Sequence, residues 1–266
     1  MPSSPTSPII TLTTDFGLSD HYVGTIKGVI LSRCPHAIIT DITHELPAFS
    51  TIAGAYAIAQ AARFFPPHTI HVVVVDPGVG TVRKPILVQA GSQAFIAPDN
   101  GVLALVLQQH KAATVREITN RALWLESPSQ TFHGRDIFAP VAASLAAGLA
   151  KPEQVGPVLT RYEPMSDLHA REVEPGVWHG RILSIDHFGN VITNFPSDTS
   201  STTFTLDVAG RGIHAFHKTF ADAPPGELFA YHGSSGYIEI GMNQQSAATS
   251  LKVSVGDAVA RRDTIL

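Results

Sequence analysis

Residues 71–83 read HVVVVDPGVGTVR, and this stretch decides the fold class. Four consecutive valines bounded by turn residues are typical of a strand buried on both faces, which is common in parallel sheets covered by helices. Asp76 then follows the carboxyl end of the strand, at the edge where open α/β sheets bind ligands. Because Asp-Pro-Gly is also ordinary turn chemistry, a turn-capping role for Asp76 is the alternative.

The N-terminal part of the chain alternates strand and helix patterns. Strands are expected at 9–14, 37–42, 71–75, 85–90, 94–97 and 113–118, and helices at 20–34, 50–65, 101–110 and 136–149. Asp20 and Ser50 are expected as helix N-caps, and Pro66 is expected to end the second helix. This alternation predicts an α/β fold with a mainly parallel sheet and helices on both faces.

The composition changes in the last third of the chain. From Gly176 onward, short alternating segments such as WHGRILSID, TTFTLDV, GYIEIGM and LKVSV are separated by turn residues, without a good helix pattern. This predicts a smaller antiparallel β-barrel-like domain. We therefore expect a disordered tail over 1–8, an α/β domain over 9–165 and a β domain over 166–266, with a linker at 162–176.

The overall composition excludes several classes of protein. A net charge of −4 provides no basic surface for nucleic acid. The single cysteine, Cys34, cannot form an internal disulfide, which favours a reducing cytosol. The first residues, MPSSPTSP, lack a signal-peptide pattern, and no apolar run reaches membrane-spanning length. We expect a cytoplasmic globular protein with neither a nucleic-acid nor a membrane partner.

Polar residues stand at several predicted junctions between strands and the segments that follow them. They are Asp15 in TTDFG, Asp76 in DPGVG, Asp99 and Asn100 in PDNG, and His133 in TFHGRD. In a parallel sheet, several of these residues would gather at one edge, which predicts a site there. Taken singly, PDNG is a turn signature and Asp136 is a candidate helix cap.

The glycine-rich loop does not match the common nucleotide-binding motifs. No Gly-Lys-Ser/Thr follows DPGVG, and Arg83 stands where the third glycine of a dinucleotide fingerprint belongs. The histidines form neither an H-x-x-x-H nor an H-E-x-x-H pair. We therefore expect no metal centre and no organic cofactor.

Six motifs in one order make the chain resemble a known family: TTDFG, DPGVG followed by Arg83, PDNG, TFHGRD, DHFGNVITN at 186–194 and SSGYIEIGMN at 234–243. The chain is similar to S-adenosyl-L-methionine (SAM) hydroxide adenosyltransferases, relatives of the fluorinase and chlorinase, from about residue 9 onward. The resemblance implies a catalytic N-terminal α/β domain, a C-terminal β domain and a homotrimer with active sites between neighbouring subunits. It implies hydrolysis of SAM to adenosine and L-methionine.

The resemblance also implies roles for individual residues. Asp76, Arg83 and His133 match the residues that act on water, with the guanidinium favouring hydroxide character and either Asp76 or His133 accepting the proton. Gly78 and Gly80 are expected to let the backbone approach the ligand. The implied substrate-binding residues are Asp15 at the ribose, together with Phe49, Asp186, Asn190, Phe220, Ser234, Ser235, Glu239, Met242 and Asn243.

Some of these positions have purely structural alternatives. Asp186 and Asn190 fit a hairpin turn, because FGN is a good turn sequence. Glu239 and Met242 fit ordinary strand positions. Ser235 stands where the fluorinase has an arginine, which leaves the binding of the methionine carboxylate open.

Two departures separate the chain from the halogenating relatives. Asp76 stands where those enzymes have hydroxyl-bearing residues, and KPILVQAGSQAFIAPDNG leaves no room for their extra loop. A carboxylate repels a desolvated halide but is useful beside a water molecule. We therefore expect a SAM hydrolase. The alternatives are a halogenase that forms a 5′-halo-5′-deoxyadenosine and a non-catalytic nucleoside-binding sensor.

Overall fold

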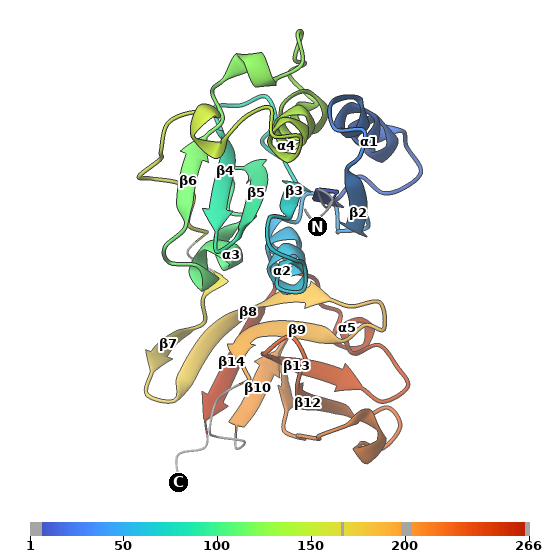
Figure 1. Cartoon of the computed structure of the whole chain (residues 1–266). Helices are drawn as coiled ribbons and strands as arrows, with labels where there is room; N and C mark the ends of the chain where they lie inside the picture. The colour runs from blue at the N-terminus through green and yellow to red at the C-terminus, as the bar shows by residue number, and fades with distance from the viewer. Residues whose placement is uncertain (1–6, 166–167, 198–203, 264–266) are drawn as a thin grey trace, which may run out of the picture. The chain divides into compact units, whose positions relative to one another are not determined.

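The computed structural model describes residues 7–165, 168–197 and 204–263. Contacts divide the chain into two compact units, Met1–Met165 and Ser166–Leu266, each with its own apolar core (Figure 1). Most of the expected N-terminal tail lies outside the described residues. Within the described part of this segment, the carbonyl of Pro8 accepts from the amide of Ile38 at 2.9 Å.

A six-stranded sheet forms the centre of the N-terminal unit, in the order β2-β1-β3-β5-β4-β6. Its strands are β1 (Ile9–Thr14), β2 (Ile38–Thr43), β3 (Ile70–Val74), β4 (Pro85–Ala90), β5 (Gln93–Pro98) and β6 (Thr114–Glu117). The strands β2, β1, β3 and β5 run parallel, whereas β4 pairs antiparallel with β5 and β6. The predicted mainly parallel sheet is confirmed, with an antiparallel edge.

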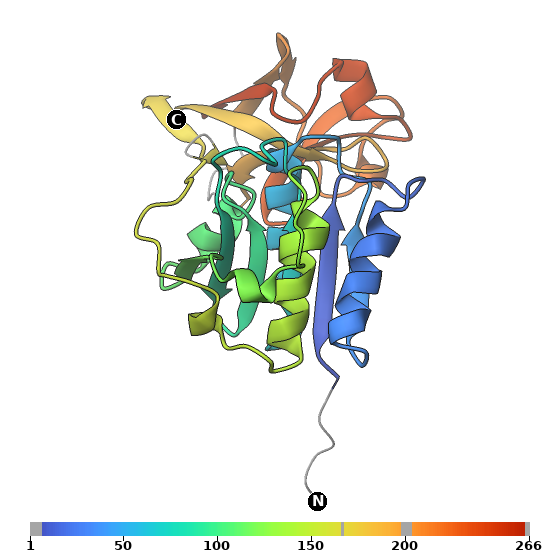
Figure 2. The same ribbon diagram turned by 90° about the horizontal axis from the view of Figure 1, so that it is seen from above.

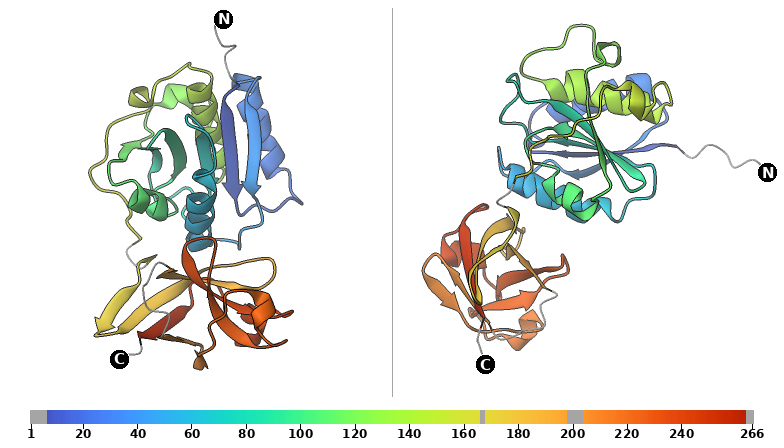
Figure 3. Two further views of the ribbon diagram at one scale, coloured as in Figure 1. Left: turned by 60° about the horizontal axis from the view of Figure 1, so that its bottom comes forward. Right: turned by 90° about the vertical axis from the view of Figure 1, so that its left-hand side faces the viewer.

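Helices cover both faces of this sheet (Figures 2 and 3). Helices α1 (Tyr22–Arg33) and α4 (Ala139–Ala146) pack together on one face, and α2 (Thr51–Ala62) and α3 (Ala104–Gln109) pack together on the other. Every residue of β3 is buried between these layers. The prediction that the valine strand is covered on both faces is confirmed.

The ends of the first two helices differ in part from the sequence predictions. Asp20 is not a cap, because α1 begins at Tyr22 after His21, which makes no side-chain capping bond. Ser50 is confirmed as a cap, since its hydroxyl accepts from the amide of Ala53 at 3.3 Å. Helix α2 ends at Ala62, ahead of Pro66, and the side-chain amide of Gln93 donates to the carbonyl of Ala62 at 3.0 Å and to that of Phe65, beyond the helix, at 2.8 Å.

The alanine-rich helix begins with a π turn, Gly134–Phe138, that leads directly into α4. Asp136 lies inside this turn rather than at its start, so the capping interpretation is wrong. Its buried carboxylate accepts from the amide of Ser129 at 2.7 Å and pairs with Arg135. The π turn begins immediately after His133.

The C-terminal unit contains an antiparallel sheet in the order β11-β10-β14-β8-β9-β13-β12, and β7 pairs with β8. Its strands are β7 (Arg171–Glu174), β8 (Val177–Ile185), β9 (Val191–Pro196), β10 (Phe204–Val208), β11 (Arg211–Ile213), β12 (Leu228–His232), β13 (Tyr237–Met242) and β14 (Ala258–Asp263). The segment after β11 returns to β12, where Phe216 bridges to Ala230, so the sheet nearly closes. The predicted barrel-like domain is confirmed.

Two details of the C-terminal prediction are wrong. LKVSV is not a strand, because helix α5 (Ala247–Leu251) ends there and Lys252 adopts a left-handed φ of 58°. The last strand is instead β14, whose pattern is interrupted by charged residues. The expected linker at 162–176 also contains a strand, β7, which pairs antiparallel with β8.

Candidate active site

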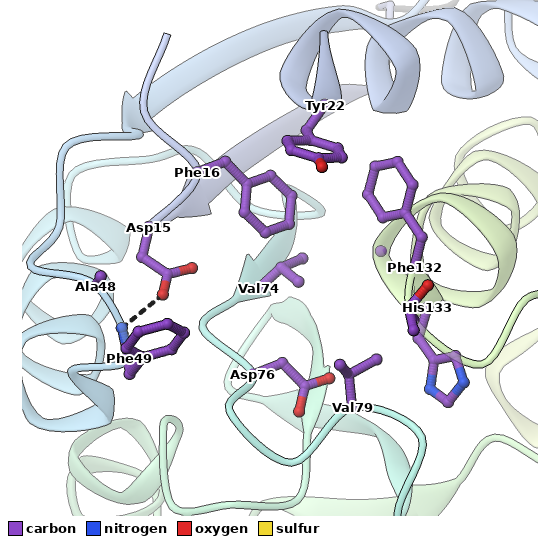
Figure 4. A pocket seen from close by; sticks show the side chains of 12 residues that line it. Asp15, Phe16, Tyr22, Ala48, Phe49, Val74, Asp76, Val79, Phe132 and His133 are labelled. Carbon is purple, nitrogen blue, oxygen red and sulfur yellow. Dashed lines mark hydrogen bonds between the residues drawn. The ribbon is translucent and has the colours of Figure 1, made fainter. Parts of the chain in front are cut away.

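The carboxyl ends of β1, β3 and β5 lie at one edge of the sheet, because these strands run parallel. Asp15 directly follows β1, Asp76 follows β3 by two residues, and His133 precedes the π turn. These three side chains line one pocket (Figure 4). Of the polar residues predicted to gather at this edge, Asp15, Asp76 and His133 do so in one pocket.

This edge pocket has a volume of about 430 Å³. Its lining residues are Asp15, Phe16, Tyr22, Ala48, Phe49, Val74, Asp76, Val79, Thr131, Phe132, His133 and Gly134. Most of the wall is apolar or aromatic, and its polar groups are two carboxylates, one imidazole and the hydroxyl-bearing residues Tyr22 and Thr131. Such a lining is typical of sites that bind and orient small organic molecules.

Asp76, Arg83 and His133 form one connected group. Arg83 Nε donates to Asp76 Oδ1 at 2.9 Å, and Nη2 donates to Oδ2, so the ion pair is bidentate. Arg83 Nη2 also donates to His133 Nδ1 at 2.7 Å. The side chains of Arg83 and Asp76 are 8% and 6% exposed, respectively. Burial and the bidentate geometry hold the three groups in a defined arrangement.

Within the described residues, Arg83 is not part of the pocket wall, whereas its two partners are. Its guanidinium lies over the ring of Phe138, with Cζ 5.5 Å from the ring centroid. Nη1 is buried and has no hydrogen-bond partner among the described residues. Arg83 therefore stands behind Asp76 and His133 and orients both of them.

The same geometry decides which nitrogen of His133 is protonated. Burial, followed by the charge of Arg83, lowers the pKa of His133 below its ordinary value, against the opposite influence of Asp76 and Asp136. Because a guanidinium only donates, His133 Nδ1 must accept from Arg83. The neutral ring then carries its proton on Nε2.

Two tight turns fold the loop between Asp76 and Arg83. The amide of Val79 donates to the carbonyl of Asp76 at 3.2 Å, and Gly80 adopts a left-handed φ of 78°. A Cβ atom at Gly80 would lie 2.5 Å from the carbonyl oxygen of Gln130. Gly80 thus allows the loop to pack against the segment that leads to His133, so the close approach is to the protein's own backbone.

We expect Gly80→Ala to lower the free energy of unfolding by about 2 to 4 kcal/mol, because it adds a backbone clash to a left-handed φ. Gly148→Ala is the matched control, since Gly148 has a φ of 68° with no atom within 4 Å of the added Cβ. The control should lose only about 1 kcal/mol. Urea unfolding of both variants measures the difference, and equal losses would contradict the packing role of Gly80.

The loop after β2 holds Asp15. The amide of Phe49 donates to Asp15 Oδ2 at 2.8 Å, as the dashed line in Figure 4 shows. Phe49 has a φ of 66° and is 72% exposed, and its ring lies beside the pocket opening. The structure thus brings Asp15 and Phe49 together, as expected for two residues that contact one ligand.

Three aromatic rings form another part of the pocket wall. The ring centroid of Tyr22 lies 5.7 Å from that of Phe16 and 5.2 Å from that of Phe132. None of these three residues is among the predicted site residues. Phe16 and Phe132 stand next to Asp15 and His133 inside quoted motifs, which was the available signal, whereas Tyr22 only looked like the start of a helix.

Asp99 and Asn100 lie at the same sheet edge but do not line the pocket. Asn100 Nδ2 donates to the carbonyl of Val75 at 2.9 Å, which supports the backbone just before Asp76. Asp99 accepts from the amide of Glu163 at 2.8 Å, and burial raises the pKa of its carboxyl group. Both residues support the chain around the pocket.

A second pocket lies within the C-terminal unit and has a volume of about 630 Å³. It is lined by Phe188, Asn190, Phe220, Met242, Gln244, Gln245 and Ser246. Asn190, Phe220 and Met242 were expected to bind substrate, and the fold brings these three together.

Asp186 holds the turn between β8 and β9. Its Oδ1 accepts from the amides of Phe188 at 2.9 Å and Asn190 at 2.8 Å, and its Oδ2 accepts from Asn190 Nδ2 at 2.7 Å. The hairpin-turn alternative therefore accounts for the contacts of Asp186. Through them the carboxylate also orients Asn190 at the wall of the second pocket.

The remaining predicted residues do not line either pocket. Glu239 is 8% exposed and accepts from Tyr231 at 2.6 Å and from Ser235 at 2.8 Å. Asn243 Nδ2 donates to the carbonyl of Ala223 at 2.6 Å. Ser234 lies exposed in the turn before β13.

Two kinds of feature are absent from residues 7–165, 168–197 and 204–263. No group of three or more His, Cys, Asp or Glu side chains is arranged to hold a metal ion in these ranges. In the same ranges, no helix has both the length and the apolar character needed to cross a membrane.

Comparison with known families decides what the chain is related to. Residues 10–156 match the SAM hydroxide adenosyltransferase N-terminal domain, and residues 180–260 match the C-terminal domain of that family. The chain belongs to the SAM hydroxide adenosyltransferase family. Each adenosyltransferase domain falls within one of the two compact units.

Curated relatives of the chain carry the names of enzymes. The (R)-S-adenosyl-L-methionine hydrolase of Salinispora arenicola (strain CNS-205) is 40% identical over 261 residues, which cover 94% of this chain and 96% of the relative. A fluorinase of Actinoplanes sp. (strain N902-109) is 29% identical over 286 residues, which cover 94% and 96%. The crystal structure of an uncharacterized conserved protein from Thermotoga maritima is 41% identical, with a TM-score of 0.85, and covers 95% of this chain and 99% of that one.

Proposed function

We propose that this adenosyltransferase hydrolyses SAM to adenosine and L-methionine. The name of the curated relatives supports this activity, because four hydrolases between 35% and 40% identical match over nearly the full chain. The observation that carries the proposal is the buried Asp76–Arg83–His133 group, which presents a carboxylate and an imidazole to the edge pocket.

The reaction needs an oriented water molecule. It does not need a general acid to protonate the leaving group, because the sulfonium is already a good leaving group. The water oxygen forms a bond to C5′ of the ribose while the C5′–S bond breaks. The electron pair of that bond neutralises the sulfonium, so methionine leaves as a neutral thioether. One water proton must be removed, and this is the step for which a positioned base is useful.

Asp76 is the group best placed to accept that proton. His133 Nδ1 is occupied by Arg83, and the neutral ring offers only the Nε2–H donor. His133 would therefore orient the water oxygen, while the Asp76 carboxylate accepts a water proton. Arg83 acts through both residues by holding them 2.9 and 2.7 Å from its own nitrogens.

Asp15 is proposed to accept hydrogen bonds from the ribose hydroxyls, since a carboxylate suits a vicinal diol. Asp15→Asn keeps the shape but turns one acceptor into a donor. It should weaken adenosine binding by about 1 to 3 kcal/mol, because a charge-assisted pair is lost. Isothermal titration calorimetry measures this effect. An unchanged dissociation constant would leave Asp15 with only its role of holding the loop at Phe49.

We also propose a homotrimer in the cytosol, in which a neighbouring subunit completes the edge pocket. The family resemblance supports the trimer, and so do large apolar side chains left exposed near that pocket, Phe49 at 72% and Val82 at 100%. The single cysteine supports a reducing compartment. Sedimentation equilibrium measures the assembly, and a monomer that retains full turnover would contradict it.

The other predicted residues are proposed to hold the remaining parts of the substrate. Asn190, Phe220 and Met242 contact it directly from the second pocket. Asp186 and Glu239 are proposed to act mainly by fixing neighbouring side chains, given the bonds that occupy their carboxylates. Ser234, Ser235 and Asn243 are proposed to contribute near the methionine part.

A hydrolase is favoured over a halogenase by two features. The Asp76 carboxylate lines the pocket where a halide would have to lose its water shell, and the two charges would repel. Strands β4 and β5 are joined by a turn of only Gly91 and Ser92, so the extra loop of the halogenating relatives has no counterpart at this turn.

Incubation with SAM in oxygen-18 water tests the proposed function. Mass spectrometry should find the label in adenosine and none in methionine, because water attacks C5′. Parallel reactions with added chloride or fluoride should yield no 5′-halo-5′-deoxyadenosine. A halogenated product would establish the halogenase instead, and adenosine binding without turnover would establish a sensor.

A further inference from the structure

Two buried histidines contact threonines of the same central strand, β1. Thr14 Oγ1 lies 2.8 Å from His44 Nδ1, and Thr11 Oγ1 lies 2.7 Å from His71 Nδ1. All four side chains are at most 4% exposed. The two pairs differ in position, because Thr14 is the last residue of β1, next to the edge pocket, whereas Thr11 lies three residues earlier.

The His44 pair continues toward the surface. His44 Nε2 makes a close polar contact with Asp41 Oδ1 at 3.1 Å, and Lys27 Nζ of α1 donates to Asp41 Oδ2 at 2.6 Å. The pairing of β1 with β2 shifts by one residue between Leu12 and Thr13. The extra residue lies between Asp41 and Thr43, and His44 follows the end of β2 in contact with Asp41.

His44 also links the two loops that carry the polar and aromatic wall of the edge pocket. Its carbonyl accepts from the amide of Gly17 at 2.8 Å, and Thr14 Oγ1 accepts from the amide of Phe16 at 3.3 Å. Five residues beyond His44, the amide of Phe49 donates to Asp15. Two hydrogen bonds thus join the loop after β1 to the loop after β2: one from Gly17 to His44, and one from Phe49 to Asp15. His44 is buried, whereas Phe49 is exposed.

We propose that His44 is a positioning residue that sets the Asp15 carboxylate and the Phe49 ring for the nucleoside part of the ligand. This inference rests on the proposed function, because it assigns the edge pocket to the ribose. His44 lies outside the pocket wall and acts through Thr14 and the backbone of both loops. His44 restricts the conformations of Asp15 before the ligand binds. Less conformational entropy is then lost on binding.

Matched isosteric substitutions on one strand test the proposal. Thr14→Val and Thr11→Val each remove the threonine hydroxyl that contacts a buried histidine. Both substitutions should lower the melting temperature, because the histidine loses a hydrogen-bond partner. Only Thr14→Val should raise the dissociation constant of adenosine, by about 5- to 10-fold, while Thr11→Val stays within about twofold. KM for SAM should rise with it while kcat changes little, because binding in the ground and transition states is affected alike.

The path through Asp15 has its own control. If His44 acts by setting Asp15, Thr14→Val combined with Asp15→Asn should weaken adenosine binding little more than Asp15→Asn alone. His44→Phe and His71→Phe should repeat the asymmetry of the threonine pair. Equal binding losses in the two pairs, or fully additive losses in the double variant, would overturn the proposal.

A ligand-free measurement separates this proposal from the proposed function. Hydrogen exchange at the amides of Gly17 and Phe49 should be faster in Thr14→Val than in Thr11→Val at matched global stability. If the wild-type protein neither binds adenosine nor cleaves SAM, the proposed function fails even when the exchange difference is seen. If the wild type binds and cleaves but the exchange rates are equal, only the positioning role of His44 fails.

Discussion

Asp76→Ala is expected to lower the single-turnover rate of SAM cleavage by about 10²- to 10⁴-fold, the range for loss of a positioned acid or base. Arg83→Ala and His133→Ala should fall in the same range, because the three side chains form one hydrogen-bonded group. Combining the substitutions should cost little more than one of them, since residues that act as a unit are strongly non-additive.

Thermal unfolding of the same preparations separates catalysis from turn formation. If Asp76 only caps a turn, Asp76→Ala should lower the melting temperature by a few degrees and leave the folded protein active. Arg83→Lys is a sharper probe, because a lysine keeps the positive charge but lacks the planar guanidinium. It cannot pair with Asp76 in the same bidentate way while also donating to His133. A stable Asp76→Ala protein with a near-normal single-turnover rate would refute the mechanism.

Acidification is expected to remove about 3 kcal/mol of stability through His71 alone, as burial lowers the pKa of this residue from 6.5 to about 4. The neighbouring Gln93 side chain partly opposes that shift. Above pH 6.5 both the folded and the unfolded states hold a neutral ring. Between pH 6.5 and 4 only the unfolded state takes up the proton, so stability falls; below about 4 both states are protonated and the loss is complete.

Urea unfolding across this pH range measures the effect. His71→Phe keeps an aromatic ring between Phe65 and Phe95 but cannot titrate, so its stability should fall less steeply than that of the wild type. His36→Asn at an exposed position is the control and should follow the wild-type slope. Parallel curves for wild type and His71→Phe would show that the unfolding of this unit is not linked to protonation of His71.

Most of the N-terminal fold could be predicted because local pattern and tertiary position agree there. The valine strand is apolar without interruption because it is covered on both faces. Ser50 caps α2 by accepting from an amide only three residues further along the chain. The C-terminal sheet was harder. LKVSV has a strand-like composition but lies in a helix end and a turn, whereas the true strand β14 contains Arg261, whose charge is met by Asp263.

The sequence by itself determined the class of fold, the order of the motifs and the placement of Asp15 and Asp76 at one sheet edge. These follow from strand direction and from contacts between near neighbours in the chain. Only the tertiary structure decided that Arg83 stands behind its two partners, that Asp186 is occupied by its own turn, and that His44 joins two pocket loops. The physical reason is that a polar side chain has several possible partners, and which of them it meets depends on segments that are distant in sequence and are brought together only when the core is packed.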